Sequence, residues 1–216
     1  ALNRSGTSAT VAAALVQEGK DAAAALDEAQ DHWVLENHGA EIGFRHPLLR
    51  TSVLDLATSA QQRSAHRALA DVLAADPPSL AGTWHRAEAA AGPDRQLAQD
   101  LVYAADLSRT RQGYAAASAA MERAALLVGD AALSADWMAT AAEDAMLAGD
   151  GARTTKLVAR VLDGPGPPRA HGRALLTLGM LEEYAGSVPY ATELLASAAD
   201  RLDGEHRTRA LAELAL

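Results

Sequence analysis

The residues best placed to do chemistry stand together in the stretch IGFRHPLLR, residues 42–50. Arg45 and Arg50 flank His46 in this stretch. Pro47 comes next, and proline favours the first position of a helix because its missing N–H has no partner there in any case. A helix N-terminus has free N–H groups and a partial positive charge, and imidazole and guanidinium groups donate hydrogen bonds to phosphate. The stretch is therefore either a plain strand-to-helix turn or an anion site.

The other polar residues form no catalytic or metal-binding pattern. The sequence has no P-loop, no GxGxxG cradle, no HExxH or GxSxG motif and no cysteine. Of the seven histidines, His32, His38 and His46 are the ones that could converge, around a predicted hairpin. His85 and Glu88 share a helix face, but their i, i+3 spacing is common on solvated surfaces. We expect no enzymatic activity and no metal site.

Composition narrows the fold class to a mainly helical one. Hydrophobic residues make up 49% of the 216 residues and aromatic residues only 4%, so the apolar content is mostly alanine, leucine and valine. Such a composition favours closely spaced helices. The net charge of −9 argues against contact with nucleic acid or an anionic membrane. No apolar run approaches the roughly 20 residues of a membrane span, and no signal peptide is evident, so we expect a cytoplasmic location.

The first part of the chain predicts helices, a hairpin and a further helix. Asn37, His38 and Gly39 form a turn between two short apolar stretches, because asparagine and glycine tolerate the positive φ angles of tight turns. The order helix, helix, hairpin, helix is that of the later part of a winged-helix domain. We assign residues 1–58 to such a partial domain. The predicted elements are helices at 7–18 and 21–31, strands at 34–35 and 42–44, and a helix at 47–58.

From Ser59 onward the pattern predicts only helices, and a repeat of 37 residues emerges. Large apolar residues fall where a helix fills the core, and alanine or glycine falls where a partner helix crosses closely. Gly149 and Gly186 share a turn column. The repeat columns are Leu101/Met138/Leu175, Ala104/Ala141/Leu178, Ala105/Ala142/Gly179, Ala117/Thr154/Ala191, Ala120/Leu157/Leu194, Met121/Val158/Leu195 and Ala124/Val161/Ala198.

These columns are typical of stacked helix-turn-helix repeats. They resemble tetratricopeptide (TPR) repeats, whose usual period is a few residues shorter; the alternative is an alanine-rich bundle with chance periodicity. We expect a TPR-like α-solenoid over 59–216, with the helix from Glu205 opening a further unit that is cut short. The three tryptophans, Trp33, Trp84 and Trp137, are expected to anchor the core or a groove.

The segment FRHPLLRTSVLDLATSAQQRSAHRALADVL, residues 44–73, resembles the large ATP-binding regulators of the LuxR type, the MalT-like signal-transduction ATPases. Phe44–Arg50 matches the family's F-R-H-P/D-L-[LV]-R phrase, and Arg63–Ala70 matches its R-x-x-H-R-x-L-A helix. Residues 84–94, 113–125 and 147–162 look like the family's superhelical repeats. The resemblance covers most of the chain from Leu35 onward.

The resemblance implies a chain order of P-loop NTPase module, winged-helix domain, helical-repeat sensor and DNA-binding helix-turn-helix. This chain would hold the end of the winged helix and part of the sensor, without the NTPase domain and without direct nucleic-acid contact. In related switch ATPases a histidine at the position of His46 contacts the β-phosphate of ADP. Pro47 replaces the acidic residue that follows that histidine in the family, so only His46 carries this role over, as a possible ADP sensor.

The function implied is that of a regulatory fragment in an ATP-dependent transcriptional regulator. Its repeats would bind a small-molecule inducer or a regulatory protein and so control an ATP/ADP switch in the intact protein. Two alternatives stay open: a TPR-like adaptor that binds protein partners without a nucleotide switch, and a regulatory module of a cyclase or kinase.

Overall fold

The chain is mainly helical, as its composition predicts, and it divides into two compact units. The computed structural model describes residues 7–74 and 80–215, which form twelve α-helices and one two-stranded antiparallel sheet. The units are Ala1–Ala91 and Gly92–Leu216. Among the described residues, no helix is both long and apolar enough to cross a membrane.

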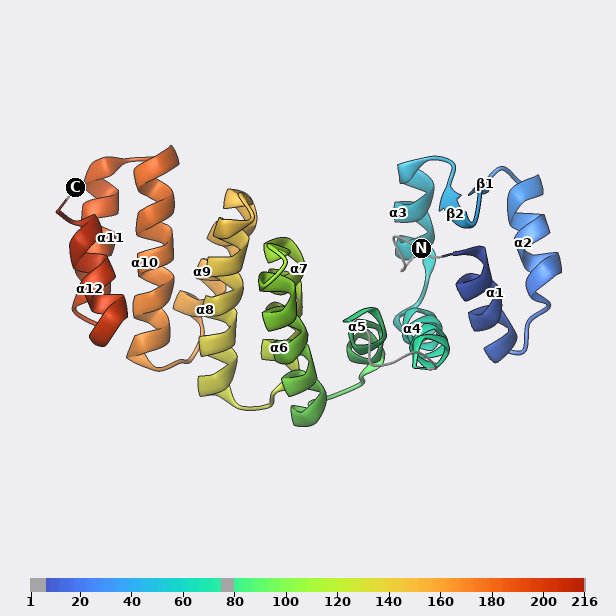
Figure 1. Ribbon diagram of the computed structural model, residues 1–216, viewed down its shortest axis with the longest axis horizontal. Helices are drawn as coiled ribbons and strands as arrows, with labels where there is room; N and C mark the ends of the chain where they lie inside the picture. The colour runs from blue at the N-terminus through green and yellow to red at the C-terminus, as the bar shows by residue number, and fades with distance from the viewer. Residues whose placement is uncertain (1–6, 75–79, 216) are drawn as a thin grey trace. The chain divides into compact units, whose positions relative to one another are not determined.

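The first unit contains five helices and the hairpin, in the predicted order (Figure 1). Side chains placed just before the helices satisfy their first N–H groups: Thr7 and Asp21 cap the first two, and Thr58 forms a capping box with Gln61. The elements are α1 (Ser8–Gln17), α2 (Ala22–Asp31), β1 (Leu35–His38), β2 (Glu41–Phe44), α3 (Pro47–Leu56), α4 (Ser59–Leu73) and α5 (Leu80–Ala89).

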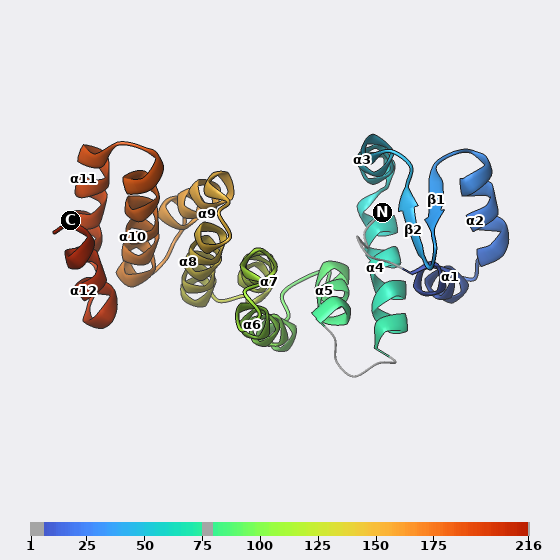
Figure 2. The same ribbon diagram turned by 45° about the horizontal axis from the view of Figure 1, so that its top comes forward.

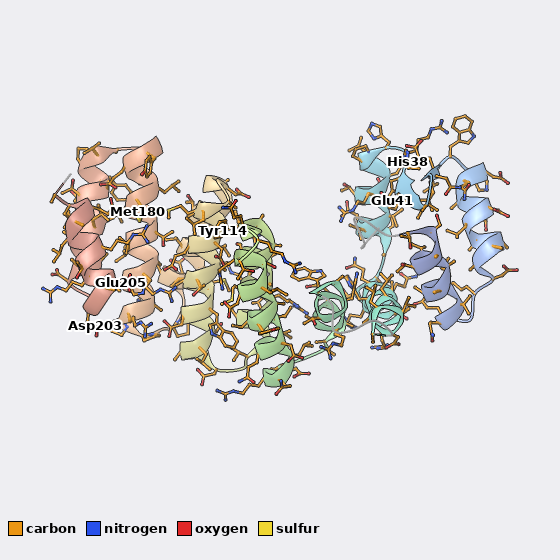
Figure 3. The ribbon with its side chains drawn as sticks, viewed as in Figure 1. His38, Glu41, Tyr114, Met180, Asp203 and Glu205 are labelled. Carbon is orange, nitrogen blue, oxygen red and sulfur yellow. The ribbon has the colours of Figure 1, made fainter. Side chains whose placement is uncertain are left out.

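The hairpin has the turn that its sequence predicts. Leu35 pairs with Phe44 at its open end, and His38 pairs with Glu41 beside the turn (Figure 3). Gly39 follows β1 with a φ of 68°, a conformation that costs glycine little. In addition, Thr7 forms an isolated antiparallel bridge with Glu41, so the chain just before α1 lies beside β2.

Helix α4 holds the first unit together. Ala68 and Leu69 of α4 form a small core with Ala14 of α1 and the partly buried Val72, and α5 packs on α4. Because α4 and α5 pack with the preceding helices, the compact units divide at a different point from the predicted domains, 1–58 and 59–216. The identities of those domains stay predictions.

The second unit consists of seven helices. Helices close in sequence pack side by side, α6 on α7, α7 on α8, α8 on α9, and α10 on α11 (Figures 1 and 2). Aspartates cap α6, α8 and α9: Asp94, Asp130 and Asp150 each accept a backbone N–H three residues on. The helices are α6 (Arg95–Arg109), α7 (Tyr114–Leu127), α8 (Ala131–Leu147), α9 (Gly151–Asp163), α10 (Pro168–Ala185), α11 (Val188–Ala199) and α12 (Gly204–Glu213).

The 37-residue columns coincide with these helix pairs. Their members are buried, apart from Leu175 and Leu178, which are half-buried. Small residues do stand where helices approach closely: a Cβ on Gly179 would lie 2.8 Å from the Leu195 side chain. The glycine column falls in the turns, where Gly149 has a φ of 77° and Gly186 caps α10. The columns thus fall on helices that contact each other, and the assignment of these helices to repeats of a solenoid stays a prediction.

Candidate functional site

His46 is the N-cap of α3, at the point where β2 passes into the helix. Its Nδ1 accepts a hydrogen bond from the backbone N–H of Leu48 at 3.2 Å. Its carbonyl oxygen accepts from the N–H of Leu49 at 3.0 Å, and Pro47 has no N–H. The first backbone donors of α3 are therefore used within the chain. The histidine itself fills the capping role, as in a plain strand-to-helix turn.

This hydrogen bond determines which nitrogen of His46 can act on a ligand. A neutral imidazole has one N–H and one acceptor nitrogen, and here the acceptor is Nδ1. The neutral ring therefore carries its proton on Nε2. The His46 side chain is exposed, so this N–H is a donor at the protein surface. Such a donor suits a phosphate oxygen.

Arg45 is engaged elsewhere, on the face of Trp33. The guanidinium carbon lies 3.7 Å from the centre of the Trp33 ring, a cation–π contact. Trp33 has a φ of 59° at the end of α2, where Val34 N–H bonds back to the Ala29 carbonyl at 2.9 Å. This turn leaves the indole 63% exposed. Of the two places expected for Trp33, a core or a groove, the structure excludes the core.

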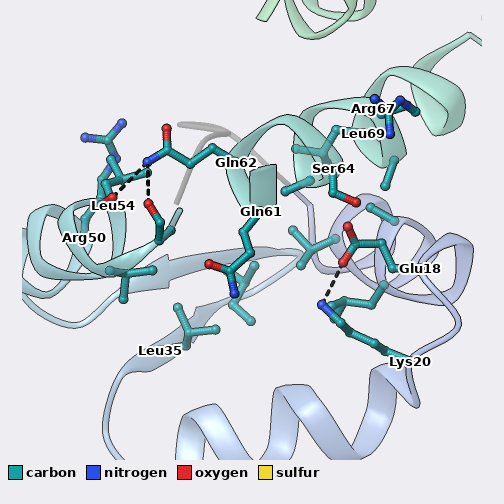
Figure 4. A pocket seen from close by; sticks show the side chains of 18 of the residues that line it. Glu18, Lys20, Leu35, Arg50, Leu54, Gln61, Gln62, Ser64, Arg67 and Leu69 are labelled. Carbon is teal, nitrogen blue, oxygen red and sulfur yellow. Dashed lines mark hydrogen bonds and ion pairs between the residues drawn. The ribbon is translucent and has the colours of Figure 1, made fainter. Parts of the chain in front are cut away.

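Arg50 lies half-buried on α3 and lines a pocket in the first unit (Figure 4). The pocket has a volume of about 1320 Å³ and lies among α1, the hairpin, α3 and α4. Its walls are mostly apolar, and Arg50, Lys20 and Arg67 are its cations. The apolar lining includes Val11, Leu15, Leu35, Ile42, Phe44, Val53, Leu54, Leu56 and Leu69.

Fixed polar groups stand among these apolar side chains. Lys20 Nζ lies 2.7 Å from Glu18 Oε2. Hydrogen bonding to Lys20 lowers the pKa of the Glu18 carboxyl, and hydrogen bonding to Ser64 lowers it further. Gln62 Nε2 donates to the carbonyl oxygens of Leu54 at 2.9 Å and Ala57 at 3.2 Å, which fixes α4 to the end of α3. An apolar pocket with a few oriented polar groups is the usual form of a binding site.

The three residues singled out around Pro47 therefore have three different surroundings. His46 caps α3, Arg45 stacks on Trp33, and Arg50 faces the pocket, which His46 does not line. The histidines considered for a metal do not cluster either: within residues 7–74 and 80–215 no three His, Asp or Glu side chains are arranged to hold a metal ion.

Sequence reasoning missed a second polar cluster, in the second unit, where arginines join alternate helices, α6 to α8 and α8 to α10. Arg109 of α6 donates two hydrogen bonds to Asp144 of α8, from Nε at 2.8 Å and from Nη2 at 2.7 Å, and it also contacts Asp106. The Asp144 side chain is only 3% exposed. Burial raises the pKa of the Asp144 carboxyl, and the hydrogen bonds with Arg109 oppose that rise. The same bonds raise the pKa of Arg109.

Arg173 of α10 makes the corresponding contact on the other side of α8. It donates to both carboxylate oxygens of Glu143, at 2.9 and 2.8 Å, and to the Thr140 hydroxyl at 2.8 Å. The spacing of these residues in the sequence gives little indication of the bridges. Arg109 and Asp144 are 35 residues apart and Glu143 and Arg173 are 30 apart, and neither interval equals the repeat.

A second missed pair is His66 of α4 and His85 of α5, whose Nδ1 atoms lie 2.8 Å apart inside the first unit. The i, i+3 spacing relates His85 to Glu88 of the same helix and does not indicate His66. The site features thus belong to a mainly helical chain with one hairpin, an exposed cap histidine and an apolar pocket. Comparison with known proteins finds no matching family model, no similar curated protein and no similar solved structure.

Proposed function

We propose that this chain is the regulatory segment of an ATP-dependent transcriptional regulator of the LuxR type. In this proposal residues 1–58 form the end of a winged-helix domain, and the helices beyond form a TPR-like solenoid. The solenoid binds an inducer or a regulatory protein, and His46 senses ADP held by an NTPase module of the same protein. The segment itself is not an enzyme and works in the cytoplasm.

The observation that carries the proposal is the hydrogen bond between His46 Nδ1 and the N–H of Leu48. This bond directs the Nε2 proton outward at the end of the hairpin, as a phosphate sensor requires. Two further features support the winged-helix assignment: the order of α1, α2, the hairpin and α3, and the bridge between Thr7 and Glu41. That bridge lies where a third strand would join the hairpin.

The solenoid assignment is supported by the repeat columns. The equivalent positions Ala117, Thr154 and Ala191 are all buried, as are Met121, Val158 and Leu195. Each helix pair thus presents the same apolar positions to its neighbours, as stacked repeats do. A ligand on such an array can shift a two-state switch only if it binds one state better than the other.

The test begins with the coding sequence on both sides of this chain, where the proposal expects a P-loop upstream and a helix-turn-helix downstream. In the intact protein, His46→Asn is the informative variant. The asparagine carboxamide oxygen replaces Nδ1 as the cap acceptor, but the side chain lacks the outward Nε2–H. We expect this variant to lose ADP during purification and to raise basal transcription, whereas wild type retains ADP. Unchanged ADP retention together with unchanged transcription would contradict the sensor role.

An adaptor without a nucleotide switch is the second candidate, and exposed apolar side chains on the second unit favour it. Tyr103 is 73% exposed on α6 and Tyr184 is 88% exposed on α10, and Leu147 of α8 is also exposed. Tyrosine is enriched at protein–protein interfaces, because its ring is apolar and its hydroxyl is polar. If the flanking sequence lacks a P-loop, this candidate becomes the preferred one; a cyclase or kinase domain there would instead indicate a regulatory module of that enzyme.

A further inference from the structure

The histidine pair between α4 and α5 is a buried titratable pair that the proposed function does not use. The side chains come from helices that pack on each other, and His66 and His85 are 6% and 3% exposed. Their ring centroids lie 5.0 Å apart with the planes inclined at 43°, and the two Nδ1 atoms are 2.8 Å apart. This is the distance of a hydrogen bond and not of a mere packing contact.

Only one proton fits between the two Nδ1 atoms. One ring must donate Nδ1–H, and the other must accept with an unprotonated Nδ1. If both rings are fully protonated, two N–H groups and two positive charges face each other at this distance. The hydrogen bond is then lost, and the charges stay buried at high cost.

We infer that His66 and His85 form a proton-sensitive latch, which holds α5 on α4 at neutral pH and releases it when both rings become protonated. This inference is independent of the nucleotide switch. Helix α5 is the last helix of the first unit, which ends at Ala91.

Charged side chains lie near the pair on the helices that pack together. On α4, Arg63 lies one turn before His66; on α5, Arg86 follows His85 directly and Glu88 lies one turn beyond it. On α1, which packs on the same helix, Glu18 is paired with Lys20. The pKa of His85 is lowered by burial, which agrees with a ring held neutral in the folded state.

The direction of the pH effect follows from that lowered pKa. A group whose folded pKa lies below its unfolded value binds fewer protons when folded. Its contribution to stability is therefore complete above the unfolded pKa, about 6.5 for histidine, and declines as the pH falls below it. Helix α5 should hence open more often at pH 5.5 than at pH 7.0.

Hydrogen exchange of the complete chain in EDTA tests the latch. After correction for intrinsic rates, we expect the opening constant of the α5 amides to rise about eightfold from pH 7.0 to 5.5, the limit for one histidine that stays neutral when folded. The variant with both His66→Asn and His85→Asn keeps an N–H···O bond but cannot titrate, and its α5 opening should not change. His32→Asn, at an exposed position, should behave like wild type.

Nitrogen NMR of the wild-type imidazoles gives a second test that needs no variant. At pH 7.0 we expect one ring of the pair to be protonated at Nδ1 and the other to be unprotonated there. Two rings that both carry the proton on Nε2 would overturn the latch, as would an equal rise of α5 opening in the double variant. Protection of α5 that depends on added Zn²⁺ would also overturn it, because the pair would then be a metal ligand.

Discussion

At the scale of single residues, His46 has a structural role that is separable from any sensing role. Its Nδ1 satisfies the N–H of Leu48, and the loss of an N-cap side chain typically costs about 1 kcal/mol. An asparagine can accept the same hydrogen bond, whereas an alanine cannot. The two substitutions therefore distinguish capping from the donation of a proton to a ligand.

We expect His46→Ala to lower the free energy of unfolding of the first unit by about 1 kcal/mol, and His46→Asn to leave it within about 0.5 kcal/mol of wild type. Urea denaturation followed by circular dichroism measures both. Equal losses in the two variants would mean that the ring contributes by packing and not as a cap.

Residue-scale reasoning also explains which polar residues were predictable. His46 and Pro47 were located correctly because capping and helix starts depend on neighbours in sequence. The His66–His85 pair and the Arg109–Asp144 bridge were missed because both depend on which helices pack together. At Trp33, a local turn with a positive φ excludes one of the two expected places, the core.

At the scale of helices, the two partners of the ion pair between α6 and α8 differ in their exposure to water. Arg109 is partly exposed and retains Asp106 as a partner, whereas Asp144 is nearly inaccessible to water. Loss of the arginine would leave a buried carboxylate without its main partner. Loss of the carboxylate would leave an arginine that can still be solvated.

We therefore expect Arg109→Met to destabilise the second unit by about 3 kcal/mol, and Asp144→Leu by clearly less. The double variant should be closer to wild type than Arg109→Met, because two apolar side chains can replace a buried ion pair. The defect of Arg109→Met should diminish as the pH falls, since burial already raises the pKa of Asp144 and protonation removes the unpaired charge. Urea denaturation between pH 5 and 7 measures this, and additive single losses would contradict it.

Close helix contacts give a second prediction at this scale, at Gly179 of α10. A Cβ there would lie 2.8 Å from two atoms of Leu195, so Gly179→Ala should destabilise the second unit by about 1–3 kcal/mol despite the better helix propensity of alanine. Gly151→Ala is the matched control, because its nearest side-chain atom, on Leu181, would be 3.4 Å away. Thermal denaturation compares them; an equally stable Gly179→Ala variant would show that Leu195 can move aside.

At the scale of the whole chain, the two units have cores of different size. Among the described residues of the first unit, the buried hydrophobic side chains are alanines and Leu69. The second unit buries many larger ones, including the cluster of Leu176, Met180, Leu195 and Leu202. The second unit should therefore be the more stable one.

We expect urea to unfold the chain in two steps, the first unit before the second, and a fragment spanning 92–216 to keep its helices when expressed alone. Circular dichroism of the fragment and of the complete chain measures this. Gly179→Ala should shift only the second step and His46→Ala only the first. A single transition that both variants shift would mean that the units unfold together.

Much of the whole-chain organisation was predictable, because the positions of helices follow from the local spacing of apolar residues along the sequence. Helix α3 begins at the predicted Pro47, and the segment from 162 to 170 does stop one helix and start another. The boundary between the compact units was not predictable in this way. It depends on the packing of α4 against both α1 and α5, and no local sequence pattern encodes that packing.

Glu143 and Asp144 are neighbours in sequence, yet they bind arginines on two different helices, Arg173 of α10 and Arg109 of α6. Helix α8 is therefore joined by side-chain bridges to both α6 and α10 from a single peptide unit. A displacement of that peptide unit would disturb both bridges together.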